Sequence, residues 1–404
     1  MIKKYIPFFF CIVVLATLYA SFSNPLDIKE THREVTYISN TSLNFKELSD
    51  YFQKLSVEKG AVYAFEVLKK ASFQGEIDLH LLGHVVGDEL YKQKSIEGIS
   101  DCTNDFRNAC SHSIVVGTLL EHGEGAISRI NEACQKAPGG KGAYTMCFHG
   151  LGHGILAFYN YELPPTIELC KKTGTKEYGN REYVECVGGA IMEMVGGGFH
   201  DKIAWEEGRK KYFTTDDPLS PCSSNFMPQE TRSICYIYIT PRLWEAVGAD
   251  SGHPTSSDFA KAFPLCEKIT TGKENKNACY EGFGKEFIGL ANSRDIRLEA
   301  LAQLDSKAFQ KIYDWCSLTP YKEAGTLCLI STLNSLYWGG ENKSDISINF
   351  CETVSTNDNT QGEACFNRLT ENVSFYISNR NYKKNFCNTL PKEYQSSCFS
   401  RLLE

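Results

Sequence analysis

The chain has 404 residues, of which 42% are hydrophobic, and its formal net charge is -7. The hydrophobic fraction is ample for a core, while the mild negative charge without a basic stripe argues against nucleic acid as a partner. This length is consistent with one large domain or two.

An apolar segment opens the chain. Lys3 and Lys4 precede an uncharged run from Tyr5 to about Phe22, a pattern typical of a secretory signal or a membrane anchor. Ser21 and Ser23 fit a cleavage site, whereas the uncleaved run is just long enough to span a bilayer. We therefore expect residues 1–23 to be a signal peptide or an N-terminal membrane anchor, with residues 5–22 in the membrane if uncleaved. Either way, the rest of the chain is expected to be extracytoplasmic.

The next segment, residues 24–45, is polar and shows no helical period, so we expect a linker. Beyond it, the stretch from Thr214 to Asn225 is rich in Asp, Pro and Ser and interrupts the pattern on either side. We therefore expect a helical half that contains the histidines, residues 46–213, and a C-terminal half, residues 214–404.

Cysteine is the strongest compositional signal. The chain has 17 cysteines; Cys11 lies in the leader, which leaves an even number in an exported chain and predicts disulfides. They fall into consecutive pairs with 7 to 15 residues between the members: Cys102/Cys110, Cys134/Cys147, Cys170/Cys186, Cys222/Cys235, Cys266/Cys279, Cys316/Cys328, Cys351/Cys365 and Cys387/Cys398. Several successive pairs recur at 35 to 37 residues, the length of a two-helix repeat. We expect neighbours to pair, although the sequence alone does not fix connectivity.

Amphipathic stretches flank the cysteines. Ile127 and Ile130 precede Cys134, and Phe366 and Leu369 follow Cys365, at the steps of three that place side chains on one helical face. The repeating unit is therefore helix, Cys, loop, Cys, helix. The predicted fold is all-α, with disulfide-stapled helical hairpins that form a curved solenoid or an α/α ring.

Aligning the units on their second cysteine places histidines in one register. The residue two positions after this cysteine is His112 in one unit and His149 in the next. One unit upstream, Asp78 takes the place of the cysteine and His80 follows at the same position. Two of these units read His-x-x-Gly-His, which adds His84 and His153.

Residues four apart share one face of a helix, and packed helices lie about 8–10 Å apart, so these imidazoles can converge. We therefore predict a metal site built from five ligands: His80, His84, His112, His149 and His153. Imidazole ligands suit zinc, copper or iron, and the sequence does not choose among them. Hydrogen-bonded core histidines and a pH-responsive cluster are the alternatives. The sequence lacks the His-Glu-x-x-His of zincin peptidases and the Cys-x-x-Cys-His of c-type haem.

Several nearby residues are weaker candidates. Glu193 and His200 are further candidate ligands, while His122 lies between acidic residues and fits either a ligand or a solvated helix end. Gly150 and Gly152 fall inside an expected helix, where each costs about 1 kcal/mol relative to Ala. Such a cost indicates close helix approach or a helix broken around a ligand.

The function that this pattern favours is an extracytoplasmic helical-repeat protein with a His-lined transition-metal site on the concave face of its N-terminal half. An open coordination position there would add metal-dependent catalysis. The alternative is a non-catalytic extracellular scaffold that binds a protein or glycan on its concave face, with structural histidines.

Overall fold

The computed structural model describes residues 28–73, 77–197, 201–250, 252–337 and 344–403. Helices are the only regular secondary structure in these ranges, which confirms the all-α prediction. The leader lies outside the described residues. None of the described helices is both long and apolar enough to cross a bilayer.

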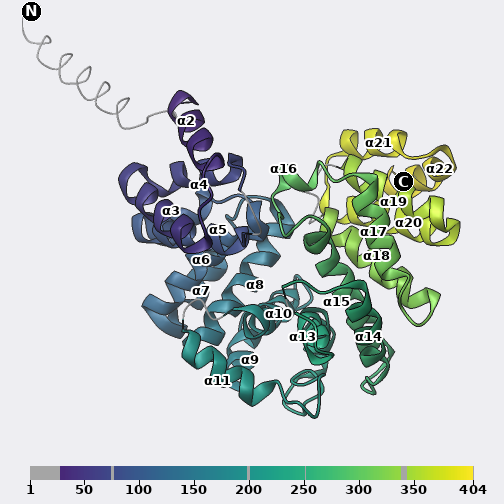
Figure 1. Ribbon diagram of the computed structural model, residues 1–404, viewed down its shortest axis with the longest axis horizontal. Coiled ribbons are helices and arrows are strands. Elements are labelled where there is room, and N and C mark those ends of the chain that lie inside the picture. Colours follow the sequence, from purple (N-terminus) through teal and green to yellow (C-terminus); the bar gives the residue numbers. More distant parts are fainter. Residues whose placement is uncertain (1–27, 74–76, 198–200, 251, 338–343, 404) are drawn as a thin grey trace, which may run out of the picture.

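The helices that carry the second cysteine of each pair form one series, which α5 begins with Asp78 in place of the cysteine. The series consists of α5 (Leu79–Lys94), α6 (Asp105–His122), α8 (Gly140–Phe158), α10 (Arg181–Gly196), α12 (Gln229–Tyr238), α15 (Lys273–Ala291), α18 (Lys322–Tyr337), α20 (Asn359–Tyr376) and α22 (Lys392–Leu403). Each member packs against the next. In Figure 1 the chain follows an arc, from α5 through α10 and α15 to α20.

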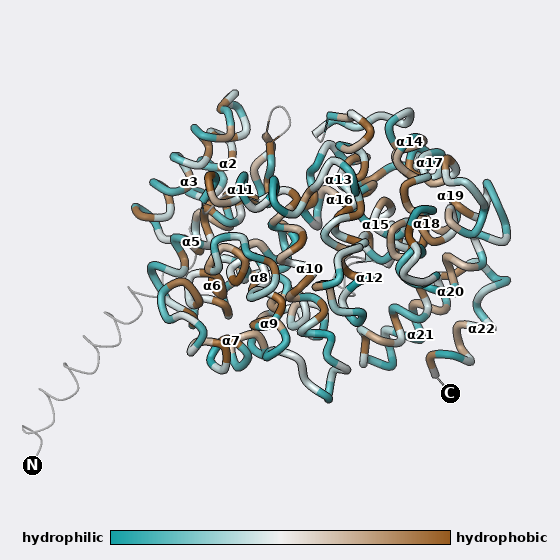
Figure 2. Tube along the Cα trace, turned by 90° about the horizontal axis from the view of Figure 1, so that it is seen from below, coloured by the Kyte–Doolittle hydropathy of each residue, from teal (hydrophilic) through white to brown (hydrophobic). Residues whose placement is uncertain are grey.

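A second set of helices covers this series or connects its members. It consists of α2 (Ile28–Ser39), α3 (Phe45–Lys59), α4 (Ala61–Lys70), η1 (Ser95–Asp101), η2 (Gly123–Ala126), α7 (Ile127–Cys134), α9 (Leu163–Lys171), α11 (Lys202–Tyr212), α13 (Thr240–Ala246), α14 (Ser256–Glu267), α16 (Leu298–Leu301), α17 (Ser306–Cys316), α19 (Ser344–Asn357) and α21 (Arg380–Thr389). Figure 2 shows hydrophobic stretches along α6 and α8, where the helices face one another, and mostly hydrophilic residues on α21.

All sixteen cysteines after the leader pair with their neighbours, as expected, with Cα–Cα distances of 5.4 to 5.7 Å. Each bridge ties one series helix to the segment that precedes it. Closing a loop of about 15 residues contributes roughly 3 kcal/mol in the chain-entropy model. The repeat unit differs from the prediction at Cys351, which lies inside α19, and at Cys222, which lies in the turns that follow α11 rather than at a helix end.

Asp78 explains why α5 begins without a disulfide. Its side chain accepts a hydrogen bond from the backbone N–H of Leu81 at 3.0 Å, which makes it the N-cap of α5. An N-cap satisfies one of the four backbone donors that a helix start leaves open. This aspartate therefore holds the helix start where the later units use a covalent bridge.

The segment expected to be a linker is partly helical, which corrects the sequence-based expectation. Residues 28–39 form α2, which contacts α4 and buries Thr31 and Ile38. Polar contacts also hold this helix: Tyr51 donates to Glu34 at 2.7 Å, and Lys59 pairs with the same carboxylate at 2.6 Å. Polar contacts of this kind leave no apolar periodicity in the sequence. The stretch from 214 to 225 consists of turns and bends between α11 and α12, and its role as a boundary stays a prediction.

Glycine allows α8 and α10 to pack at very short range. A Cβ at Gly152 would lie 1.9 Å from the carbonyl oxygen of Cys186, and one at Gly189 would lie 1.8 Å from that of His149. No side chain fits at these distances. Close helix approach, one of the two expected reasons for glycine here, is therefore the reason at Gly152.

Candidate metal centre

The structure brings the five predicted histidines together in one cluster, which we call the histidine cluster; four of them are buried and His80 is half-buried. His80 and His84 lie on α5, His112 on α6, and His149 and His153 on α8, so three neighbouring helices of the series supply all of them. The centre of the cluster is His112, whose ring centroid lies 5.7 to 5.8 Å from those of the other four. The register read from the sequence therefore corresponds to proximity in the fold; ligation itself stays a prediction.

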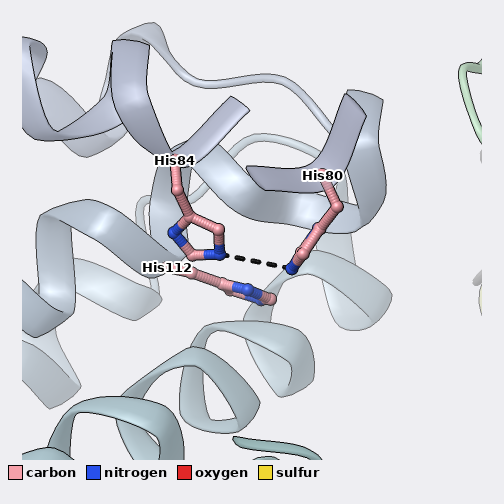
Figure 3. A group of neighbouring side chains, drawn as sticks. All are labelled: His80, His84 and His112. Carbon is pink, nitrogen blue, oxygen red and sulfur yellow. Dashed lines mark hydrogen bonds between the residues drawn. The ribbon is translucent and has the colours of Figure 1, made fainter. Parts of the chain in front are cut away.

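Three of these side chains form the tightest group. One ring nitrogen from each of His80, His84 and His112 can be chosen so that all three lie within 4.8 Å of one another. Figure 3 shows the rings of His80 and His84 above that of His112, with the two Nε2 atoms 3.2 Å apart. These atoms could hold a metal ion.

The hydrogen-bond partners of His80 and His84 indicate which nitrogen carries the proton. His80 Nδ1 lies 2.6 Å from the carbonyl oxygen of Phe106, which can only accept, so Nδ1 is the donor. The hydroxyl of Ser113 donates its one proton to the carbonyl of His84 and therefore accepts from His84 Nδ1 at 3.0 Å. In neutral rings each Nε2 atom then carries a lone pair instead of a proton. The two lone pairs face one another.

His112 is buried and makes no hydrogen bond through either ring nitrogen. Its ring packs against α8 at Gly150, where a Cβ would lie 2.4 Å from His112 Cδ2. Burial lowers the pKa of His112 well below its ordinary value, and the neighbouring histidines add to the effect. Burial also lowers the pKa of His80. The fold thus keeps these imidazoles in the neutral form that binds metals.

Acidic and sulfur-containing side chains of α10 support the two histidines of α8. His153 Nδ1 lies 2.9 Å from a carboxylate oxygen of buried Glu193, whose other oxygen accepts from Tyr161 at 3.0 Å. His149 Nε2 lies 3.3 Å from Met192 Sδ, and burial lowers the pKa of His149 well below its ordinary value. Histidine ligands of metals are commonly held in this way by a carboxylate on their second nitrogen. Glu193, a weaker candidate from sequence, therefore belongs to the site.

A left-handed turn at the start of α6 aims the carbonyl that orients His80. Phe106, Arg107 and Asn108 have φ values of 56°, 51° and 64°, a region that non-glycine residues rarely occupy. The bridge between Cys102 and Cys110 encloses this turn. Residues held in such conformations cost about 1–3 kcal/mol each and concentrate at functional sites.

A cavity of about 450 Å³ adjoins the cluster. His80, His84, His153 and Glu193 line one wall, and residues from α12, α13, α15 and nearby loops line the opposite wall, among them Tyr238, Trp244, Glu286 and Arg294. The Tyr238 ring also lies 4.7 Å from that of His149. Sequence reasoning missed this second wall, because no motif marks it and the two walls are far apart along the chain.

Three further histidines lie apart from the cluster or outside the described residues. His122 ends α6, ten positions after His112 and therefore about 15 Å further along the helix; its side chain is 41% exposed, as expected of a solvated helix end. His253 borders the cavity with a side chain that is 65% exposed. His200 lies outside the described residues.

No family model, curated protein or solved structure matches this chain. The geometry of the site therefore carries the functional argument.

Proposed function

We propose that this chain is an extracytoplasmic helical-repeat protein that binds a transition-metal ion through His80, His84 and His112. Eight disulfides suit an oxidising compartment, and the apolar leader in the sequence suits export. The finer architecture that we propose is a curved solenoid or ring whose inner side presents the histidines.

One observation carries the proposal: two lone pairs face one another at 3.2 Å, on His80 Nε2 and His84 Nε2. Two nitrogens bound to a tetrahedral ion at Zn–N distances of 2.0–2.1 Å stand about 3.3–3.4 Å apart. The separation between the two rings is therefore close to what a shared ion requires. His112 provides a third nitrogen within reach.

Without a cation this arrangement is unfavourable. Either two lone pairs repel one another, or one ring carries a proton and thus a positive charge in a buried place, which is costly. A metal ion removes both problems, because it attracts each lone pair. It also gives the unpartnered His112 an interaction.

The donor set narrows the choice of metal. Because the sixteen cysteines of the described residues are oxidised, none of them offers a thiolate, and imidazole ligands suit zinc, copper or iron. Three protein ligands with a further position open to a cavity are the arrangement of catalytic zinc sites. Such an ion supplies a Lewis acid or an activated water. The adjoining cavity supports metal-dependent catalysis as the finer part of the proposal.

Elemental analysis of the oxidised, exported protein tests this proposal. We expect at least one equivalent of a transition metal per chain, and we expect the tightest-bound equivalent to be lost in the His80→Gln, His84→Gln double variant. His122→Gln is the matched control, because it changes a solvated histidine on α6. Less than a tenth of an equivalent in the wild type, unchanged in the double variant, would favour the scaffold with structural histidines.

A further inference from the structure

We propose that the histidine cluster holds two metal ions and that His112 bridges them as an imidazolate. The second ion would be bound by His112, His149 and His153. This inference rests on the proposed function, since the first ion occupies the site formed by His80, His84 and His112.

A single ion would leave several ring nitrogens of the histidine cluster without a partner. An ion on His80 Nε2, His84 Nε2 and one nitrogen of His112 leaves the other His112 nitrogen, His149 Nδ1 and His153 Nε2, which are all buried and without hydrogen bonds; His149 Nδ1 lies 3.9 Å from the Glu185 carboxylate. Buried polar atoms are nearly always satisfied in folded proteins, so three such nitrogens in one cluster call for a missing partner. A second cation satisfies these nitrogens together.

The ring centroids of the cluster form two similar triangles that share a corner at His112. The ring centroids of His80, His84 and His112 are separated by 4.7, 5.8 and 5.8 Å. Those of His149, His153 and His112 are separated by 5.1, 5.8 and 5.7 Å. Two sets of imidazoles with the same spacing indicate two sites of the same kind.

The repeat explains how two such sites arise around one residue. Helices α5 and α8 each carry His-x-x-Gly-His at the same register, and α6 packs between them. In each outer pair the second histidine is held by a polar side chain through Nδ1, since His84 contacts Ser113 at 3.0 Å and His153 contacts Glu193 at 2.9 Å. The Nε2 atom of each is thereby turned away from that partner.

Binding of the second ion requires His112 to lose a proton. Neutral His112 loses its remaining N–H proton to solvent when the second divalent ion binds, and the resulting imidazolate donates one lone pair to each ion. The carboxylate of Glu193, next to His153, adds a further negative charge beside the second ion. The two ions would adjoin the same cavity, because His80, His84 and His153 all line it.

The two sites should fill in order. The nitrogens of the first set already lie within 4.8 Å of one another, whereas the second set must close on its ion by rotation of imidazole rings. Copper accepts imidazole ligands, and Met192 Sδ at 3.3 Å from His149 Nε2 already engages the nitrogen that would not face the second ion. Cu(II) is therefore a suitable probe.

Titration of metal-free, oxidised protein with Cu(II), followed by electron paramagnetic resonance, tests the inference. We expect two equivalents per chain, with the doublet signal growing over the first and falling over the second, because an imidazolate couples the two spins. The His149→Gln, His153→Gln double variant should bind one equivalent and keep the full doublet signal, while His122→Gln should behave as the wild type does.

One bound equivalent in the wild type, or two with uncoupled spins, would overturn the inference and leave the proposed function intact. Retention of both equivalents in the double variant would also overturn it. The wild-type coupling decides the matter even where the variant fails to fold. No binding of Cu(II), or binding unaffected by His80→Gln with His84→Gln, would instead contradict the proposed function.

Discussion

A serine hydroxyl and a backbone carbonyl decide what the two histidines of α5 can do. Phe106 and Ser113 each engage an Nδ1 atom, which leaves the Nε2 atoms of His80 and His84 as lone pairs that face one another. The proposed metal site thus depends on two residues that are not among its ligands. This arrangement is the outer layer of contacts that orients metal-binding histidines in many proteins.

Ser113→Ala tests this control of the tautomer. The variant removes the acceptor for His84 Nδ1, so the ring is free to rotate or to move its proton to Nε2. We expect affinity for the first metal equivalent to fall by about 10–100-fold, the usual effect of losing such a partner. Competition with a coloured chelator measures this affinity. Ser100→Ala is the control, because its exposed hydroxyl contacts only the carbonyl of Glu97 in the same turn; an equal loss in both variants would contradict the prediction.

Among the elements, α2 shows how polar contacts can hold a helix that apolar periodicity does not reveal. Glu34 accepts from Tyr51 and pairs with Lys59, and these two contacts fasten α2 to α3. The same contacts lower the pKa of Glu34, with the hydrogen bond from Lys59 as the largest cause. The anchor therefore depends on an ionised carboxylate.

Glu34→Gln tests the anchor through its pH dependence. Hydrogen bonds to charged groups contribute about 1.5–3 kcal/mol, and partial exposure reduces this, so we expect a loss of about 1–2 kcal/mol at pH 7. Because the pKa in the folded state lies below the ordinary 4.5, this stabilisation is present above pH 4.5 and is lost as the pH falls through the lowered value. Denaturant unfolding of both proteins at pH 7 and at pH 3 measures it. A difference that stays constant with pH would contradict the assignment.

On the scale of the whole molecule, the repeat was readable from the sequence, whereas the cavity was not. Periodic cysteines gave the pairing of neighbours, and one register together with the His-x-x-Gly-His motif gave all five histidines of the cluster. The sequence did not reveal the second wall, because Tyr238 and Arg294 lie far from the histidines along the chain and no motif marks them. Nor did it reveal the left-handed turn at Phe106, since Phe and Arg rarely adopt that conformation and only Asn108 has a tendency toward it.

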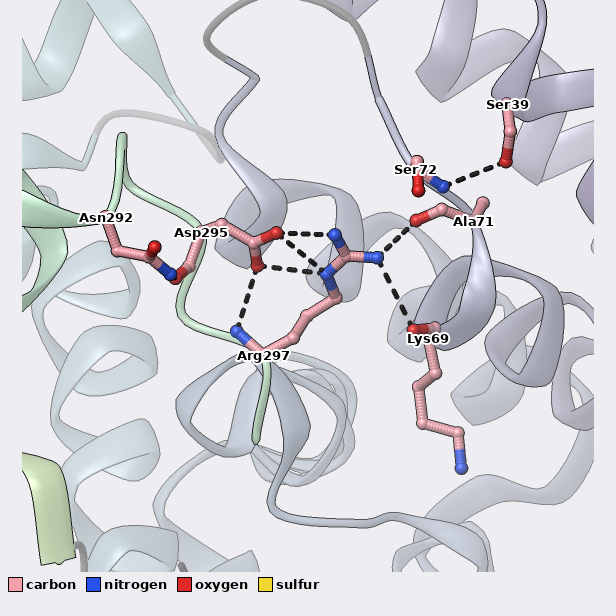
Figure 4. A network of polar contacts seen from close by, with 7 residues as sticks. All are labelled: Ser39, Lys69, Ala71, Ser72, Asn292, Asp295 and Arg297. Atoms are coloured by element: carbon pink, nitrogen blue, oxygen red, sulfur yellow. Dashed lines mark hydrogen bonds and ion pairs between the residues drawn. The ribbon is translucent and has the colours of Figure 1, made fainter. Parts of the chain in front are cut away.

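A contact between distant parts of the chain holds the two walls together. Arg297 pairs with Asp295 and donates to the carbonyl oxygens of Lys69 and Ala71 at the end of α4, the latter 226 positions away in sequence (Figure 4). On one side of this contact Ser72 is itself held by Ser39 at 2.9 Å. On the other side, Arg294 and Ile296 line the cavity.

Arg297→Ala should therefore loosen the cavity without disturbing the histidines. Loss of the contact frees the segment around residue 295 to move away from α4, so an ion in the cluster becomes more accessible to a competing chelator. We expect removal of the metal to become several-fold faster while the number of equivalents bound stays unchanged, which stopped-flow mixing with excess chelator measures. Arg129→Ala is the control, since that residue forms an exposed ion pair with Glu97 on another part of the surface. Equal removal rates in the two variants would show that this contact does not control access, and the way to the metal would then lie along another edge of the cavity.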